Sequence, residues 1–415
     1  IMLFLMEYYP RIIEKRLKPW IRKRQAILIR GPRQVGKTTL FLHLKEKLNG
    51  KYVSLEKESI LKTFEENPDL FVKRFKSKYL FIDEAQYSKK AGRIIKLIYD
   101  SYPQTKLFVT GSGSFDIKVL ISKYLVGRAV SFELLPLNFE EFLMWRAKDL
   151  ARVHTEFKGE VLNFVNGKEK IKLQKAFESE FKQMLSEFLI FGGFPEIVKE
   201  KDERFKRELL ENLYRTYLEK DVFFFLNVRH LEKFKNMMKW LAFSLGNLLE
   251  ISSITSDLKI DYKTVDNYLN ILINTYVLRL VSPFHKSLVT ELKKSKKIYF
   301  VDLGLRNAVL GNFSPLDVRP DKGKLFENFV LNELLAEGFE IKYWRTTGKA
   351  EVDFILIKEK EVIPIEVKSL GKIKRGFLSF LNAYKPRRAI VFSEKDFGIK
   401  KFAKTKVLFI PHWVI

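Results

Sequence analysis

The sequence predicts an α/β protein that begins with a parallel β-sheet covered by helices on both faces. Two observations lead to this fold class. Five short apolar segments alternate with segments of helical periodicity, at about 26–29, 51–55, 79–83, 106–110 and 129–134. Strands that alternate with helices form parallel sheets, because each crossover helix lies on a face of the sheet. In addition, a glycine-rich turn follows the first segment, and two carboxylates follow the third.

The turn after the first strand has the spacing of a Walker A phosphate-binding loop. A buried strand is predicted before it, and a helical pattern begins at its end. The motif consists of Gly31, Pro32, Arg33, Gln34, Val35, Gly36, Lys37, Thr38 and Thr39. Backbone N–H groups converge at such a strand-to-helix turn, where phosphate meets a helix N-terminus. We therefore expect a P-loop NTPase domain that binds ATP or GTP, and we take ATP as its cofactor.

Three residues of this loop have distinct expected roles. Lys37 should reach the β- and γ-phosphates, and Thr38 should place its hydroxyl on Mg²⁺. Gly36 lets the backbone approach the phosphates without a side chain in the way. A match to so short a motif can arise by chance, but the strand before it and the helix after it argue against that.

A second motif lies at the end of the third apolar strand, where Asp83 and Glu84 follow one another. This is the Walker B pattern, in which Asp83 holds Mg²⁺ directly or through water and Glu84 polarises the attacking water. Two carboxylates at the end of a strand, seen alone, are more often a solvated turn. After a Walker A loop the functional interpretation is favoured, and we expect Lys37 and Glu84 to be catalytic.

Two later segments contain weaker candidates for contacts with the phosphates. Thr110 ends the fourth strand and Ser112 follows it, and either hydroxyl could sense the γ-phosphate; an ordinary strand-ending turn accounts for them equally well. Arg128 precedes the fifth strand and is a candidate for the arginine that stabilises transition-state charge. It would act in its own subunit or on a neighbour in a homo-oligomer, and a surface arginine is the competing interpretation.

Composition bounds the partners and the metal chemistry. The formal net charge is +26, from 76 Lys and Arg against 50 Asp and Glu, which indicates attraction to polyanions, and we expect DNA as partner. A Lys-rich, heat-adapted surface is the alternative, although thermal adaptation usually raises Lys and Glu together. The absence of cysteine excludes disulfides and thiolate metal sites, so a bound metal must use oxygen or histidine ligands, and Mg²⁺ fits that constraint. No apolar run has bilayer length, so we expect a cytoplasmic protein with no membrane partner.

With 415 residues the chain suggests several domains, which we place at 1–147, 148–235, 236–290 and 291–415. The first is the P-loop ATPase domain, and the second has the charged, amphipathic helices of a lid or connector. The third has the helix, turn, helix and strand pattern of a winged helix, with a polar helix face near Tyr262. That face could enter a DNA groove, but winged helices also mediate protein contacts.

The last domain contains a second constellation of charged residues. Glu327 lies on a predicted helix, Asp353 on a predicted strand, and Glu366 and Lys368 on the next strand. Residues two apart in a strand share a face, so Glu366 and Lys368 point together. Asp353 and Glu366 could hold Mg²⁺ with Glu327 as accessory ligand, while Lys368 could orient water or stabilise charge on a phosphate. Glu-x-Lys alone carries little weight, because alternating strands produce it often.

Together these motifs resemble known proteins. The first region, with Walker A and B strands separated by an inserted sensor strand, resembles the AAA-like (ASCE) division of P-loop ATPases. The order helix-Glu, strand-Asp, strand-Glu-x-Lys is similar to the core of the restriction-endonuclease-like (PD-(D/E)XK-type) fold. With the turn at 191–196, most of the chain resembles a prokaryotic ATPase family with a helical middle and such an end. The resemblance implies ATP hydrolysis; whether the last domain cleaves DNA or only binds a protein or DNA partner stays open.

Overall fold

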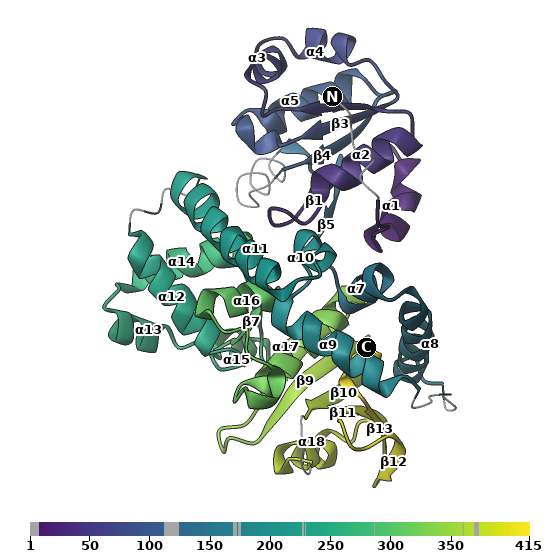
Figure 1. Cartoon of the computed structure of the whole chain (residues 1–415), viewed down its shortest axis with the longest axis vertical. Helices are drawn as coiled ribbons and strands as arrows, with labels where there is room; N and C mark the ends of the chain where they lie inside the picture. The colour runs from purple at the N-terminus through teal and green to yellow at the C-terminus, as the bar shows by residue number, and fades with distance from the viewer. Residues whose placement is uncertain are drawn as a thin grey trace. The chain divides into compact units, whose positions relative to one another are not determined.

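The computed structural model describes residues 8–111, 124–168, 172, 176–225, 228, 230–285, 287–359, 361–368 and 373–415. The chain divides into two compact units, and Figure 1 labels many of their elements, numbered in chain order. Unit 1 comprises Ile1–Pro136, Glu219–Asn227 and Asn270–Val277. Unit 2 comprises Leu137–Leu218, Val228–Leu269 and Leu278–Ile415.

Unit 1 is built on a five-stranded parallel sheet. Across the sheet the strands are β2 (Lys51–Ser54), β3 (Tyr79–Asp83), β4 (Lys106–Thr110), β1 (Ala26–Arg30) and β5 (Ala129–Glu133). Helix α1 (Ile13–Ile21) precedes β1, and the helices between the strands in the sequence are α2 (Lys37–Lys47), α3 (Glu58–Glu66), α4 (Pro68–Arg74) and α5 (Ala91–Ser101). Strand β4 separates β1 from β3, as expected for the strands of the two Walker motifs. The α/β fold class with a parallel sheet is confirmed for this region.

Apolar side chains cover both faces of this sheet. Leu80 and Ile82 of β3 belong to the core cluster that includes Ile95 of α5. Phe81, between them in the sequence, points to the other face and packs on Phe41 of α2 with ring centroids 5.3 Å apart. Because both faces are buried, the strands are almost continuously apolar, which is the pattern that parallel sheets require.

The first part of unit 2 is helical. Its elements are α7 (Phe139–Arg146), α8 (Lys148–Val165), α9 (Glu178–Phe191), α10 (Pro195–Lys199), α11 (Glu203–Thr216), α12 (Leu231–Phe243), α13 (Ile251–Leu258) and α16 (Leu303–Leu310). A π-helix (Tyr217–Phe225) and α14 (Tyr262–Asn274) each belong partly to unit 1. Strands β6 (Leu278–Val281) and β7 (Lys297–Phe300) form an antiparallel pair, with α15 (Leu288–Lys293) between them in the sequence.

The two glycines after α9 are explained by close packing. Gly192 has φ +74°, and a Cβ there would lie 2.3 Å from Oδ1 of Asp302. A Cβ on Gly193 would lie 2.1 Å from the backbone oxygen of Leu137. The N–H of Gly193 donates to Asp302 at 2.7 Å, and burial raises the pKa of Asp302 to about 6. This motif therefore ends α9 and fixes its neighbours within unit 2.

The carboxyl-terminal part of unit 2 holds a six-stranded mixed sheet. Across it the strands are β12 (Gly398–Phe402), β13 (Thr405–Ile410), β11 (Arg388–Phe392), β10 (Glu361–Val367), β9 (Glu351–Lys358) and β8 (Glu340–Arg345). Strands β8, β9 and β10 form an antiparallel meander, whereas β10 and β11 are parallel. Helices α17 (Lys322–Ala336) and α18 (Arg375–Tyr384) pack against this sheet.

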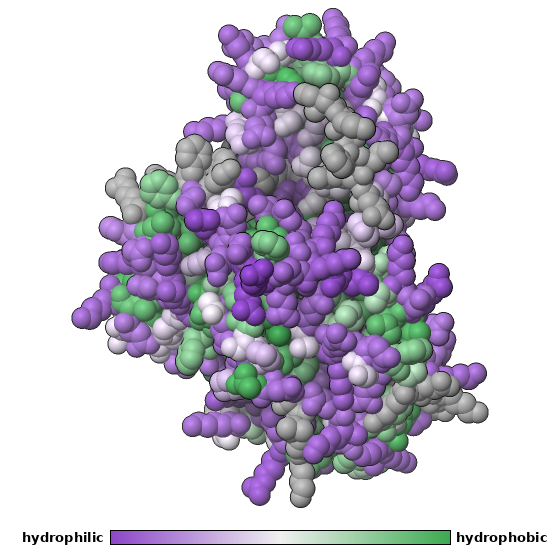
Figure 2. All heavy atoms as spheres, viewed as in Figure 1, coloured by the Kyte–Doolittle hydropathy of each residue, from purple (hydrophilic) through white to green (hydrophobic). Residues whose placement is uncertain are grey.

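Hydrophilic side chains cover most of the face of the molecule that Figure 2 presents, and apolar patches are scattered among them. Of the helices in the described part of the chain, none has the length and apolar character needed to cross a lipid bilayer.

Burial of Glu333 should make stability depend on pH. Glu333 of α17 accepts a hydrogen bond from the N–H of Phe139 at 3.0 Å, and burial raises its pKa from the ordinary 4.5 to about 8. Between these values the folded chain holds the proton more tightly than the unfolded chain. The free energy of unfolding should therefore fall as pH rises, by at most about 1.4 kcal/mol per pH unit from this group.

Glu333→Gln should reduce the difference between the free energies of unfolding measured in urea at about pH 5 and at about pH 8. Glu180→Gln, at an exposed position of α9, is the control and should leave the slope as it is. An unchanged slope in Glu333→Gln would contradict the assignment.

Candidate functional site

The predicted Walker A residues form a turn between β1 and α2. The loop residues are Gly31, Pro32, Arg33, Gln34, Val35 and Gly36, and Lys37, Thr38 and Thr39 make the first turn of the helix. Gly36 caps α2 with φ 90°, a left-handed conformation that glycine adopts without strain. A Cβ on Gly31 would lie 1.9 Å from the backbone oxygen of Leu134. Both glycines of the motif are thus required by the backbone path.

Gly31→Ala should distort the loop, because its methyl group has no room beside Leu134. We expect loss of nucleotide binding and a decrease in the free energy of unfolding of about 1–3 kcal/mol, as for other overpacked sites. Urea unfolding and nucleotide titration measure the two effects. Gly159→Ala is the control, since a Cβ on that residue of α8 meets nothing within 4 Å. Wild-type binding by Gly31→Ala would be the contrary result.

The ammonium group of Lys37 lies inside the loop. The side chain is buried, with 6% of the residue exposed, and Nζ donates to the backbone oxygens of Gly31 at 2.9 Å and Pro32 at 2.6 Å. A buried positive charge held by backbone carbonyls lies where the loop N–H groups would gather phosphate oxygens. That Lys37 exchanges these carbonyls for a phosphate stays a prediction.

Thr38 and Asp83 meet although they are far apart in the sequence. Thr38 Oγ1 donates to Oδ2 of Asp83 at 2.7 Å, and the N–H of Glu84 donates to Oδ1 at 2.8 Å. Asp83 is 1% exposed, and burial raises its pKa even though Thr38 donates to it. A hydroxyl and a carboxylate in contact are the oxygen ligands that Mg²⁺ prefers. The residues present thus fit the expected metal.

Tyr52 of β2 completes this contact and was missed by motif analysis. Its hydroxyl donates to the same Oδ2 of Asp83 at 2.9 Å, and burial beside Asp83 raises the pKa of the phenol. Tyr52 belongs to no motif in the sequence. Its role becomes visible only in the structure, where β2 pairs with β3. Tyr52 therefore helps to fix the carboxylate.

Tyr52→Phe should lower the rate of ATP hydrolysis by up to about tenfold, because one hydrogen bond to Asp83 is removed. Rates measured over a range of Mg²⁺ concentrations should show a higher requirement for the metal. Tyr79→Phe, on β3, is the control and should behave as wild type. Equal Mg²⁺ dependence in Tyr52→Phe and wild type would show that Tyr52 does not position Asp83.

Glu84 and Thr110 lie at the same edge of the sheet as the loop. Glu84 has φ 55°, a strained backbone for a residue other than glycine, and its carboxylate accepts a hydrogen bond from Gln86. Thr110 ends β4 and pairs with Ile29 of β1; its hydroxyl is buried and has no hydrogen-bond partner among the described residues. Its place between the two Walker strands suits a sensor, which stays a prediction. Ser112 lies outside the described residues.

Arg128 is not brought to the loop of its own chain. Its backbone oxygen accepts from the N–H of Ala26, at the start of β1, whereas Gly31 follows the end of this strand. Five residues of strand separate the two edges by roughly 16 Å. The Arg128 side chain pairs with Asp100, Nε to Oδ1, at 2.9 Å. Of its two predicted roles, only the one on a neighbouring subunit fits this position, and it stays a prediction.

In unit 2, Asp353 and Glu366 face each other across the antiparallel strands β9 and β10, next to the pair Phe354 and Ile365. Both carboxyl groups are buried, and the N–H of Val367 donates to Oδ2 of Asp353 at 2.8 Å. Burial and the charge of Asp353 raise the pKa of Glu366 to about 8, and burial raises the pKa of Asp353. The two predicted ligands are thus brought together.

Lys368 is buried just after β10, and its Nζ makes no hydrogen bond to the described residues. Burial lowers its pKa. Glu327 accepts hydrogen bonds from Tyr299 at 2.6 Å and from Lys324 at 2.9 Å, and its charge adds to the rise in the pKa of Asp353. Burial opposes the ionisation of Glu327, but Lys297 and Lys324 lower its pKa to about 2.

In the part of the chain that the structure describes, no group of three or more His, Asp or Glu is arranged to hold a metal ion.

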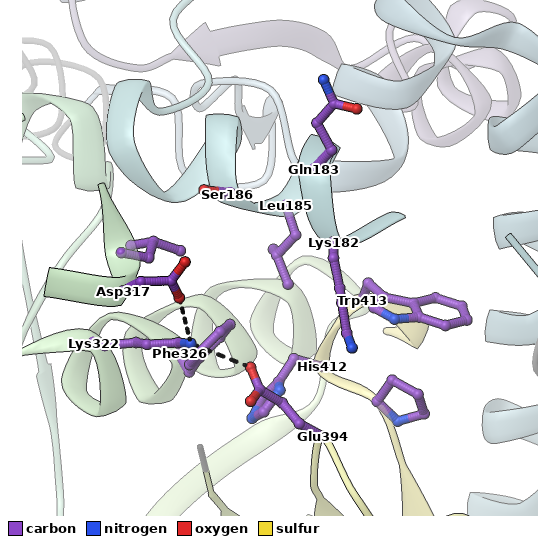
Figure 3. A pocket seen from close by; sticks show the side chains of 12 residues that line it. Lys182, Gln183, Leu185, Ser186, Asp317, Lys322, Phe326, Glu394, His412 and Trp413 are labelled. Carbon is purple, nitrogen blue, oxygen red and sulfur yellow. Dashed lines mark hydrogen bonds and ion pairs between the residues drawn. The ribbon is translucent and has the colours of Figure 1, made fainter. Parts of the chain in front are cut away.

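A pocket of about 270 Å³ lies in unit 2, apart from all the predicted site residues. Figure 3 shows Lys322 reaching between Asp317 and Glu394, with Nζ 3.4 Å and 3.6 Å from their carboxylates. His412, on the pocket wall, is buried, which lowers its pKa to about 3, and its ring hydrogen-bonds to the backbone of Lys368. The pocket wall thus supports the strand end that carries Lys368.

Strand order, loop and carboxylates define an AAA-like P-loop domain, and residues 23–143 match the family model of the AAA domain. Two further models match, both described as domains of unknown function: DUF8612 over residues 182–316 and DUF4143 over residues 322–413.

Similar proteins come from archaea and bacteria. Uncharacterized protein MJ1544 of Methanocaldococcus jannaschii is 30% identical over 298 residues, 70% of this chain and 61% of that protein. An uncharacterized protein of Haemophilus influenzae is 25% identical over 294 residues, 70% of this chain and 65% of that protein. The chain thus spans less than two thirds of the length of either relative. Among solved structures, the Aeropyrum pernix ORC1 protein in complex with DNA has a TM-score of 0.30 and 11% identity, covering 74% of this chain and 95% of that one.

Proposed function

We propose that the chain binds ATP with Mg²⁺ and hydrolyses it at the site formed by the Walker A loop and the end of β3. The observation that carries this proposal is the hydrogen bond between Thr38 and Asp83, 2.7 Å long, beside the buried ammonium of Lys37. This contact joins the two motifs into one site, and it presents oxygen ligands next to a cation that would face the phosphates.

Each residue of the site has a chemical role in this proposal. Thr38 and Asp83 would hold Mg²⁺, which neutralises charge on the phosphates when bound. Lys37 leaves the carbonyls of the loop and binds the β- and γ-phosphates, so that charge developing in the transition state meets a fixed cation. Glu84 orients and polarises the attacking water. Thr110, whose hydroxyl has no hydrogen-bond partner within the described ranges, donates it to the γ-phosphate.

Phosphate release by the purified full chain tests the activity. We expect turnover of ATP that needs Mg²⁺ and stops when the metal is chelated. GTP as competitor measures the preference for the base. No phosphate release by folded protein at any temperature below unfolding would contradict hydrolysis.

DNA is the partner that the charge and unit 2 support best. Helices α12, α13 and α14 are followed by the antiparallel pair β6 and β7, and Leu248 forms an antiparallel bridge with Lys297. This order of elements supports the winged helix that we propose. On α14, Val265 is buried, whereas Tyr262 and Lys263 are exposed. With a net charge of +26, an exposed polar helix face is suited to a DNA groove.

Salt dependence separates DNA binding from a scaffold role. Neutralising several phosphates makes affinity fall steeply with salt, so a plot of log Kd against log salt concentration should be steep. Lys263→Ala should weaken binding to all sequences and reduce the slope by about one. A flat plot would favour an ATP-switched scaffold that binds a protein partner.

DNA cleavage by the carboxyl-terminal part is the second candidate function. It is favoured by the element order α17, β8, β9, β10, α18, β11 and by the facing pair Asp353 and Glu366 with Lys368 nearby. The test compares wild type with Asp353→Ala on single- and double-stranded DNA with Mg²⁺ or Mn²⁺. Cleavage lost in the variant would support a nuclease, and equal inactivity of both would leave an inactive binding module.

A further inference from the structure

The facing carboxylates Asp353 and Glu366 already have a cation between them. Nζ of Lys374 lies 3.0 Å from Oδ1 of Asp353 and 3.2 Å from Oε1 of Glu366. Both carboxylates are buried, whereas the Lys374 side chain is 53% exposed. Lys374 is the residue just before α18. One ammonium group therefore contacts one oxygen of each acid, which is the position of a bridging cation.

The other described lysines near these acids form ion pairs with other carboxylates or make no hydrogen bond to Asp353 or Glu366. Lys297 pairs with Glu327 at 3.3 Å and with Glu351 at 2.6 Å, and Lys324 pairs with Glu327. Lys368 makes no hydrogen bond to the described residues. Among the described residues, Lys374 is thus the cation that forms ion pairs with Asp353 and Glu366.

We propose that Lys374 is the resident counter-ion of this carboxylate pair and that it excludes divalent metal from the site. A metal ion would need the same two oxygens at about 2.0–2.1 Å, and an ammonium group so close repels it. Metal entry requires that Lys374 leave, which breaks both ion pairs. The metal site that the restriction-endonuclease resemblance implies is thus closed in this form of the chain.

The proposal rests on the geometry of unit 2, which also underlies the second candidate function, and it does not depend on ATP hydrolysis. The test measures Mn²⁺ binding to the full chain without nucleotide or DNA. Electron paramagnetic resonance reports the concentration of free Mn²⁺ and thereby the amount bound. Lys374→Met should bind one additional Mn²⁺ at this site. Its affinity for this ion should exceed that of wild type by about tenfold or more. Lys374→Arg keeps the positive charge and should gain nothing.

The double variant Lys374→Met with Asp353→Asn should lose the added site, which distinguishes it from the nucleotide site of unit 1. Melting temperatures verify folding, and Lys374→Gln replaces Lys374→Met if that variant unfolds. ATP hydrolysis by Lys374→Met should equal that of wild type. The metal-binding result therefore tests this proposal, and the rate of ATP hydrolysis tests the proposed ATPase activity independently. The proposal would be overturned if wild type bound Mn²⁺ at Asp353 as tightly as Lys374→Met does. A folded Lys374→Met that binds no extra metal would overturn it as well.

Discussion

Replacing Lys37 with alanine should reduce ATP hydrolysis by roughly 100-fold or more, the effect of removing one preorganised cation or donor from a transition state. The ammonium is buried in the loop and donates to Gly31 and Pro32, so the charge is already in place before phosphate arrives. ATP affinity should fall as well, because Lys37 would bind phosphate in the ground state too. Steady-state phosphate release and ATP titration measure the two effects.

Lys47→Ala is the matched control, since Lys47 lies at the end of the same helix with its side chain 63% exposed. We expect this variant to hydrolyse ATP at the wild-type rate. If Lys37→Ala and Lys47→Ala lost activity equally, general loss of charge on α2 rather than phosphate binding would explain the result.

Glu84→Gln should separate binding from hydrolysis. The substitution keeps the size of the side chain and removes the carboxylate that polarises water, so the rate should drop by about 10²–10⁴-fold. Thr38, Asp83 and Lys37 remain in place, so ATP should still bind. Single-turnover hydrolysis with radiolabelled ATP, together with equilibrium titration, distinguishes the two steps.

Glu66→Gln, at the exposed end of α3, removes a carboxylate of the same unit and should leave the rate unchanged. Hydrolysis by Glu84→Gln at the wild-type rate would assign activation of water to another residue. Loss of ATP binding in this variant would instead make Glu84 part of the binding site.

The parallel sheet of unit 1 was predictable because its strands are buried on both faces and are therefore continuously apolar. The place of β4 between β1 and β3 followed from the order of motifs in the resemblance to AAA-like ATPases. Phosphate-binding loops are local in sequence, so Gly31, Gly36 and Lys37 could be assigned roles without knowledge of the fold. Their expected roles still await the measurements above.

Contacts between distant strands were harder to predict. Tyr52 reaches Asp83 from another strand, and Lys374 reaches Asp353 from the start of a helix, and neither belongs to a local motif. The position of Arg128 could have been inferred, because in a parallel sheet a residue before a strand lies at the opposite edge from a residue after one. Spacing along the chain does not show which oxygen a given side chain will contact.

Calorimetric titration of Mg-ATP into the wild-type chain and into Lys37→Ala tests the central claim most directly. The structure joins Lys37, Thr38 and Asp83 in one site, so wild type should bind one ATP per chain with a measurable heat of association. Lys37→Ala should bind much more weakly. No association of Mg-ATP with folded wild-type protein would contradict the account.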